Sequence, residues 1–187
     1  MPPAPEQPIF YYDLGSPACY LVAEQILGEL PLVPEFVPVL GERIGAIEPD
    51  PDRDALSRLV AQRGMQPLRW PANWPPDSRV AMLAATYAKR VGRAVAFSLA
   101  AFRQAFAGGR DLGQRDTVLI AAAACEIHPT AILKGIELGS IGRALDLAGA
   151  RALAAGVGSL PAIQLGRQVF EGERSIELAT NALTASR

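Results

Sequence analysis

Ser16 is the residue of this chain whose type and position best suit it to chemistry. It follows an aromatic run at 10–13 and precedes Pro17, which suits the first turn of a helix because that turn does not use the missing N–H. A helix start collects unpaired N–H groups and a partial positive charge, so it favours anions. A hydroxyl there can donate a hydrogen bond to a thiolate, or it can serve only as a helix cap.

Cys19 lies three residues after Ser16, on the same face of the predicted helix. It is either a reactive lone thiol or a small core residue, since free cysteine is among the most buried residue types. Because serine cannot form a disulfide, the Ser16/Cys19 pair excludes redox cycling between two cysteines. The chain has only one further cysteine, Cys125, so we expect no disulfide framework and a reduced, cytoplasmic protein.

The overall composition excludes several function classes. Lys and Arg number 18 against 19 for Asp and Glu, without a basic run, which argues against nucleic-acid binding. No apolar stretch is long enough to span a bilayer, and the N-terminus does not resemble a signal peptide. The single histidine, His128, has no neighbours at metal-ligand spacing, so we expect no metal site.

Strands and helices alternate in the two terminal parts of the chain, and these elements must position Ser16. Hydrophobic patterns and turn residues predict strands at 9–13, 36–40, 162–165 and 168–170, with helices at 17–30 and 175–183. Pro38 indicates that the second strand lies at a sheet edge. Between these elements the pattern is almost entirely helical, at 54–63, 78–90, 94–107, 115–126, 131–138 (capped by Thr130) and 141–155. This order predicts an α/β sheet interrupted by a helical insertion.

Three local motifs in this order carry a resemblance to a known family. They are F-x-x-D-x-x-S-P at 10–17, the Pro/Trp loop at 68–75, and L-P-A-I at 160–163 with its hairpin. Together they resemble the DsbA-like branch of the thioredoxin superfamily, and within it 2-hydroxychromene-2-carboxylate isomerases and kappa-class glutathione transferases. The resemblance spans about residues 9 to 183. It implies a thioredoxin-like domain formed by 9–44 and 157–187, an inserted helical domain at 45–156, and a loose tail at 1–8.

The resemblance also implies roles for individual residues. Ser16 would stabilise a thiolate, and a cis peptide between Leu160 and Pro161 would expose backbone groups of Leu160 to the peptide of glutathione. The γ-glutamyl end would meet the start of the last helix, at Glu173, Arg174 and Ser175, which is otherwise an ordinary solvated helix start. Substrate contacts would come from Asn73, Trp74, Tyr12 and Cys19, although the loop tryptophans also suit a plug in the helical core.

We therefore expect a glutathione-dependent isomerase or transferase that acts on an aromatic or electrophilic small molecule. The resemblance also implies a homodimer. The segment 40–45 contains neither the Lys nor the Asn with which such isomerases contact glutathione, so another low-molecular-weight thiol stays an alternative. Two other functions also stay open. One is a thiol–disulfide oxidoreductase that uses Cys19 alone, and the other is a non-catalytic binding protein.

Overall fold

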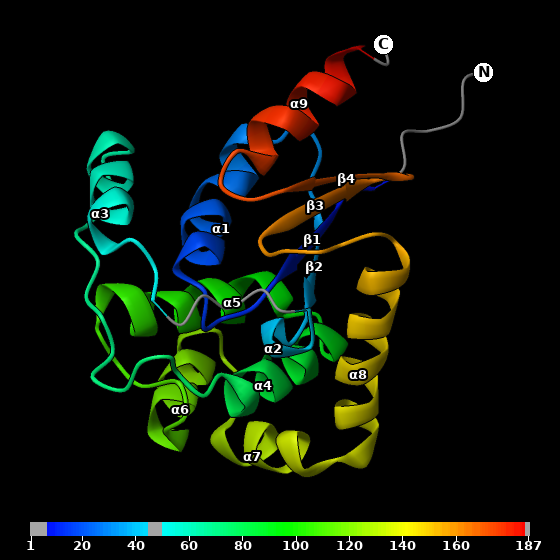
Figure 1. The fold of residues 1–187 in the computed structure, drawn as a ribbon. Coiled ribbons are helices and arrows are strands. Elements are labelled where there is room, and N and C mark those ends of the chain that lie inside the picture. Colours follow the sequence, from blue (N-terminus) through cyan, green and yellow to red (C-terminus); the bar gives the residue numbers. More distant parts are fainter. Residues whose placement is uncertain (1–6, 45–49, 186–187) are drawn as a thin grey trace.

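A four-stranded sheet formed by both ends of the chain organises the described residues, which are 7–44 and 50–185 of this computed structural model (Figure 1). The strand order is β2-β1-β3-β4, with bounds Glu35–Pro38, Ile9–Tyr12, Ala162–Leu165 and Gln168–Glu171. β1 pairs in parallel with β2, where Phe10 faces Phe36, and antiparallel with β3, where Phe10 faces Ile163. Pro38 therefore lies on an edge strand, as the sequence indicates.

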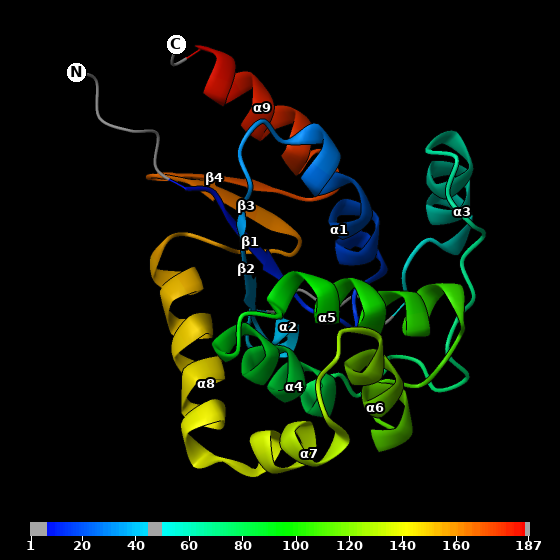
Figure 2. The same ribbon diagram turned by 180° about the vertical axis from the view of Figure 1, so that it is seen from behind.

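Helices cover both faces of this sheet. α1 (Pro17–Glu29) and α9 (Ser175–Ala185) lie together on one side, and α8 (Gly139–Ala154) lies on the other, as the front and back views show (Figures 1 and 2). α1 ends where Leu30 adopts an extended conformation, which the following Pro31 favours. The short β1–α1 connection thus brings Ser16 to the end of the central strand.

The chain between β2 and β3 forms the helical block. Its elements are α2 (Gly41–Ile44), α3 (Arg53–Gln62), α4 (Arg79–Arg90), α5 (Ala94–Phe102), the π-helix η1 (Arg103–Ala107), α6 (Arg115–Ala124), α7 (Pro129–Glu137) and α8. The predicted helix at 94–107 thus ends in a π-helical turn. The helices α4 to α7 lie below the sheet in Figure 1, whereas α3 lies beside α1. The domain boundary expected between 44 and 45, and residues 1–6 of the expected tail, lie outside the described residues.

The cap of α7 differs from the prediction. Thr130 was expected to cap a helix starting at 131, but the His128 ring accepts a hydrogen bond from the Thr130 N–H and α7 begins at Pro129. The physical reason is that Pro129 has no N–H to satisfy, so the cap moves to the residue before it.

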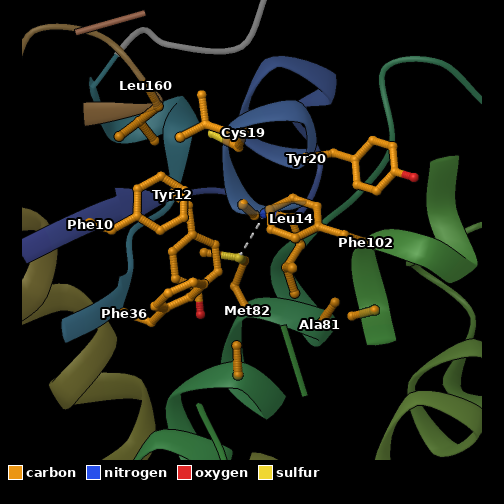
Figure 3. Packing of buried hydrophobic residues seen from close by; sticks show 14 of the residues in the cluster. Phe10, Tyr12, Leu14, Cys19, Tyr20, Phe36, Ala81, Met82, Phe102 and Leu160 are labelled. Carbon is orange, nitrogen blue, oxygen red and sulfur yellow. Dashed lines mark hydrogen bonds between the residues drawn. The ribbon is translucent and has the colours of Figure 1, made fainter. Parts of the chain in front are cut away.

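An aromatic cluster joins the sheet to the helical block. Phe10, Tyr12 and Phe36 pack as neighbouring rings at centroid distances of 5.0–5.7 Å, and Tyr12 also meets Phe102 of α5 (Figure 3). The Tyr12 hydroxyl lies 2.6 Å from the Ser98 hydroxyl, so the most buried polar atom of the cluster is paired. In the described part of the chain no helix is long and apolar enough to cross a membrane.

Candidate functional site

Ser16 is the N-cap of α1. Its backbone is extended (φ −98°, ψ 119°), its carbonyl accepts the Tyr20 N–H, and its Oγ accepts the Cys19 N–H at 3.2 Å. The bond from Cys19 uses one lone pair of the Ser16 hydroxyl. The hydroxyl proton is a donor that the Cys19 sulfur, whose pKa Ser16 lowers, and a ligand can compete for. The Ala18 N–H lies between Ser16 and Cys19 in the chain and has no hydrogen-bond partner among the described residues. The start of α1 therefore offers two adjacent donors, Ser16 O–H and Ala18 N–H.

A buried carboxylate holds the turn that carries Ser16. Asp13 is fully buried, and its two carboxylate oxygens accept the N–H groups of Gly15 and Gly41 at 2.7 Å each. Burial raises the pKa of Asp13, and these N–H groups together with the Ser78 hydroxyl oppose the rise. Asp13 thereby ties the β1–α1 turn to the starts of α2 and α4.

A cavity of about 620 Å³ opens at this helix start. The site residues that line it come from distant parts of the chain, and they are Ser16, Trp74, Leu160, Glu173 and Arg174. The structure therefore brings together five residues that the sequence analysis assigned to the site. Ser16 itself is 6% exposed, so a ligand that reaches its hydroxyl must enter the cavity.

The wall opposite Ser16 is the loop before β3. The Leu160–Pro161 peptide is cis, as the resemblance implied, and Pro161 lies beside the cavity lining while its carbonyl accepts the Gly172 N–H. No hydrogen bond between described residues uses the N–H or carbonyl of Leu160. A peptide-like ligand can therefore pair with the backbone of Leu160 as an additional strand would.

Glu171 anchors this loop from the end of β4. Its carboxylate accepts the N–H groups of Gly158 and Ser159 and the Ser159 hydroxyl. Partial burial acts to raise the pKa of Glu171, but these three donors outweigh it and hold the pKa below its usual range. Glu171 also lines the cavity, so an anionic carboxylate lies within the site.

α3 forms the outer wall together with the loop that carries Trp74. Asp52, the N-cap of α3, lines the cavity, and Arg63 after the same helix donates to the Glu173 carbonyl at 3.1 Å. Trp74 packs edge-on against Trp70 with ring centroids 4.7 Å apart, and Arg53 of α3 lies over the Trp70 ring. Trp74 is thus an aromatic lining residue of the cavity, held by its contact with Trp70 of the same loop.

Two predicted substrate contacts lie in the core instead of the cavity. Tyr12 and Cys19 are fully buried among the packed side chains shown in Figure 3, and neither lines the site. Burial raises the pKa of the Cys19 thiol to about 12, more than the neighbouring Ser16 and Asp13 groups lower it. Cys19 is therefore a protonated core residue at neutral pH.

The remaining predicted residues lie at the margin of the site. The Asn73 amide donates to Asp111 at 3.0 Å, so its side chain is engaged within the helical block. Ser175 begins α9 and is fully buried, with a hydroxyl that has no hydrogen-bond partner among the described residues. Within the described ranges no group of three or more His, Cys, Asp or Glu side chains is arranged to hold a metal ion.

Sequence reasoning missed three features of this site, namely Ala18, Asp52 and Glu171. The signal for Ala18 was present, because the second residue of any helix has an N–H without an intrahelical partner. Asp52 before a helical pattern is likewise a recognisable cap. Glu171 was read as part of a loop, since nothing local to it reveals the residues at 158–159 that it binds.

Comparison with known proteins rests on structure. No protein-family model matches this chain, and no curated protein sequence does. A 2-hydroxychromene-2-carboxylate isomerase structure aligns with a TM-score of 0.83 at 18% identity, covering 97% of this chain and 96% of that one. A probable DsbA oxidoreductase from Streptomyces coelicolor gives 0.77 at 18% identity, covering 96% and 89%. The cytosolic disulfide reductase DsbM from Pseudomonas aeruginosa, with GSH, gives 0.67 at 14% identity, covering 97% and 98%.

These alignments extend over nearly the whole chain, so the helical insertion and the sheet are matched together. The chain has the fold of a DsbA-like thioredoxin-fold protein.

Proposed function

We propose that this protein binds a low-molecular-weight thiol, with glutathione as the first candidate, and uses it in isomerase or transferase chemistry on an aromatic or electrophilic small molecule. One observation carries the proposal: Ser16, Ala18, whose N–H has no partner among the described residues, and Leu160 all line one cavity, and neither Cys19 nor Cys125 lines it. A site with donors for a thiolate but no thiol of its own suits a thiol supplied by the ligand.

The first step is ionisation of the bound thiol. A hydrogen bond to a charged group contributes about 1.5–3 kcal/mol, which corresponds to roughly one to two pKa units on the sulfur. A thiol with an ordinary pKa near 8.5 would then be largely a thiolate at neutral pH. Ser16 O–H donates this bond, and the start of α1 supplies a partial positive charge in the same direction.

The rest of the cavity suits a peptide thiol. The Leu160 backbone pairs with the cysteinyl residue, while Glu173 is available for an ammonium group and the start of α9 for a carboxylate. Among the described lining residues, Asp52, Glu171 and Glu173 are acidic and Arg174 is basic. The acidic side chains suit the ammonium group of glutathione, and Arg174 suits one of its two carboxylates.

The chemistry follows from a thiolate placed beside Trp74. In an isomerisation, the sulfur forms a bond to the β-carbon of an unsaturated carbonyl and the π electrons move to the carbonyl oxygen. Rotation about the resulting single bond precedes the reverse step, in which the C–S bond breaks and the thiolate is regenerated. In a transfer reaction the C–S bond is kept and an electrophile's leaving group departs instead.

The structure gives less support to the other two candidate functions. A single-cysteine oxidoreductase needs an accessible, acidic thiol, whereas Cys19 is fully buried with its pKa raised to about 12. A non-catalytic binding protein would keep the same cavity with Ser16 as the cap of α1, and it would bind a thiol without lowering the pKa of its sulfur.

A thermal-shift titration tests the proposal. At 100 times its dissociation constant a ligand adds about 2.7 kcal/mol, which for a chain of this size raises the melting temperature by roughly 5–10 °C. We expect this shift with reduced glutathione or another biological thiol, and a smaller one in Ser16→Ala. Ser57→Ala, an exposed serine on α3, is the matched control. No shift with glutathione, cysteine or coenzyme A up to 10 mM would contradict the proposal.

A further inference from the structure

A second cavity, of about 420 Å³, lies between the sheet and α8 and shares no lining residue with the first. The α8 residues that border it recur at spacings of three and four, so they form one face of that helix. Two of them, Ala144 and Ala148, are too small to fill the space between α8 and the strands. The cavity therefore results from small residues at the point where α8 crosses β1 and β2.

The lining combines an apolar floor with an excess of positive charge. Ile9, Val37, Ile141 and Leu147 supply the apolar surface, and Leu147 is 56% exposed. Three cations, Lys89, Arg90 and Arg151, face a single carboxylate, Glu35.

Pairing within the cavity leaves two of these cations without a counter-ion. Lys89 is bound to Glu35 at 2.6 Å, which accounts for the one carboxylate. Arg90 donates to the Ser140 hydroxyl and lies over the Tyr87 ring, and both of these partners are neutral. The Arg151 guanidinium forms no hydrogen bond or ion pair with the side chain or backbone of another described residue.

Glu35 and Arg151 both change the pKa of the Tyr11 hydroxyl, which belongs to the same cavity lining. Burial is the main effect on its hydroxyl and raises the pKa, Glu35 raises it further, and Arg151 lowers it. The hydroxyl donates to Gln164 at 2.8 Å, so the ring is fixed in the cavity wall.

We propose that this cavity is a binding site for a small amphipathic anion, a molecule with an apolar chain or ring and one carboxylate. The apolar floor receives the hydrocarbon part, and Arg90 and Arg151 bind the head group. Charge complementarity selects this occupant over a neutral or cationic one, because the lining already holds two unpaired cations. The site is separate from the thiol site and does not depend on the function proposed there.

Isothermal titration with sodium octanoate at low ionic strength tests the proposal, with octylammonium chloride as the probe of equal chain length and opposite charge. We expect one octanoate per chain and at least about tenfold weaker binding of octylammonium. Arg151→Gln should weaken octanoate about threefold, and the double variant Arg90→Gln/Arg151→Gln about tenfold. Equal affinity for the two probes, or no octanoate binding below about 10 mM, would overturn the proposal.

Matched variants locate the bound anion. Arg143→Gln removes an exposed cation of α8 that does not line the cavity, and Arg174→Gln removes the cation of the thiol site. Both should bind octanoate as the wild type does. Ala148→Trp fills the space and should abolish binding while leaving any glutathione-induced thermal shift unchanged. Octanoate binding that survives Ala148→Trp, or that Arg174→Gln weakens, would place the anion elsewhere and refute the site.

Discussion

The carboxylate of Glu171 accepts both the backbone N–H and the hydroxyl of Ser159, at 3.0 and 2.9 Å. Ser159 immediately precedes Leu160, whose backbone borders the cavity opposite Ser16. Glu171 ends β4, so this pair fixes the loop to the sheet. The Glu171 carboxylate therefore helps to set the distance between the Ser16 hydroxyl and the Leu160 backbone, together with the bond from the Gly172 N–H to the Pro161 carbonyl.

Glu171→Gln should lower both stability and thiol affinity. One carboxylate oxygen accepts both the Gly158 and the Ser159 N–H, and the other accepts the Ser159 hydroxyl. Even with its amide oxygen facing both N–H groups, the variant replaces three hydrogen bonds to a charged acceptor by bonds to a neutral amide, which we expect to cost about 1–2 kcal/mol of unfolding free energy. Urea unfolding measures this cost, with Glu137→Gln, an exposed carboxylate, as the control. A variant as stable as the wild type would show that the loop does not need this anchor.

Glu171 should also make the stability of the folded protein depend on pH. Because the pKa of Glu171 is depressed in the folded state, its contribution to stability is present above the ordinary glutamate pKa of about 4.3. It is lost as the pH falls through the lower, folded-state value. Wild type should therefore lose more stability than Glu171→Gln between pH 6 and pH 3. Parallel pH profiles for the two proteins would contradict this assignment.

Asp13→Asn should disturb Ser16 without touching the cavity. An amide cannot accept from both Gly15 and Gly41, so one buried N–H loses its partner at a cost of about 1–3 kcal/mol. The β1–α1 turn would then be less fixed and thiol affinity would fall. Urea unfolding and a glutathione thermal-shift titration measure the two effects. Unchanged values for both would mean that the turn is held by other contacts.

Cys19 should resist alkylation in the native protein. With its pKa raised to about 12 it is almost entirely a thiol at pH 8, and it is fully buried. In a Cys125→Ala background, iodoacetamide should label Cys19 at least about a hundredfold more slowly than in urea. Rapid native labelling would restore the single-cysteine oxidoreductase as a candidate.

Trp74 should report on ligands in the thiol site. Its ring lines the cavity, whereas Trp70 packs against it from behind and under Arg53. In a Trp70→Phe background, saturation with an aromatic electrophile or its thiol adduct should change the emission of Trp74. Trp74→Leu should weaken the aromatic ligand and leave the free thiol unaffected. An equal loss for both ligands would remove Trp74 from substrate recognition.

The sequence predicted the elements more completely than the side-chain contacts. Strand and helix patterns, with Pro38 at an edge and Pro17 at a helix start, are local signals, and the structure reproduces their order. Local sequence patterns did not predict the π-helix at Arg103–Ala107. One of its carbonyls, that of Phe106, accepts the Arg69 N–H from a distant loop. An apolar run such as 94–107 cannot reveal such a contact.

In the candidate site, too, contacts between residues distant in the sequence were harder to predict than local patterns. Ser16 was assigned from a local pattern, a helix start, whereas the resemblance to the DsbA-like family assigned Leu160. The same resemblance assigned Tyr12 and Cys19 to substrate contacts, yet both side chains lie in the core. Glu171 escaped notice because its partners, Gly158 and Ser159, are twelve to thirteen residues away.

The ionisation of the bound thiol tests the central claim most directly. Absorbance of the thiolate near 240 nm, followed against pH with glutathione bound, gives the pKa of that sulfur. The wild type should lower it by roughly one to two units from about 8.5, and Ser16→Ala should return it most of the way. A bound thiol whose pKa stays near 8.5 in the wild type, or stays depressed in Ser16→Ala, would contradict the account.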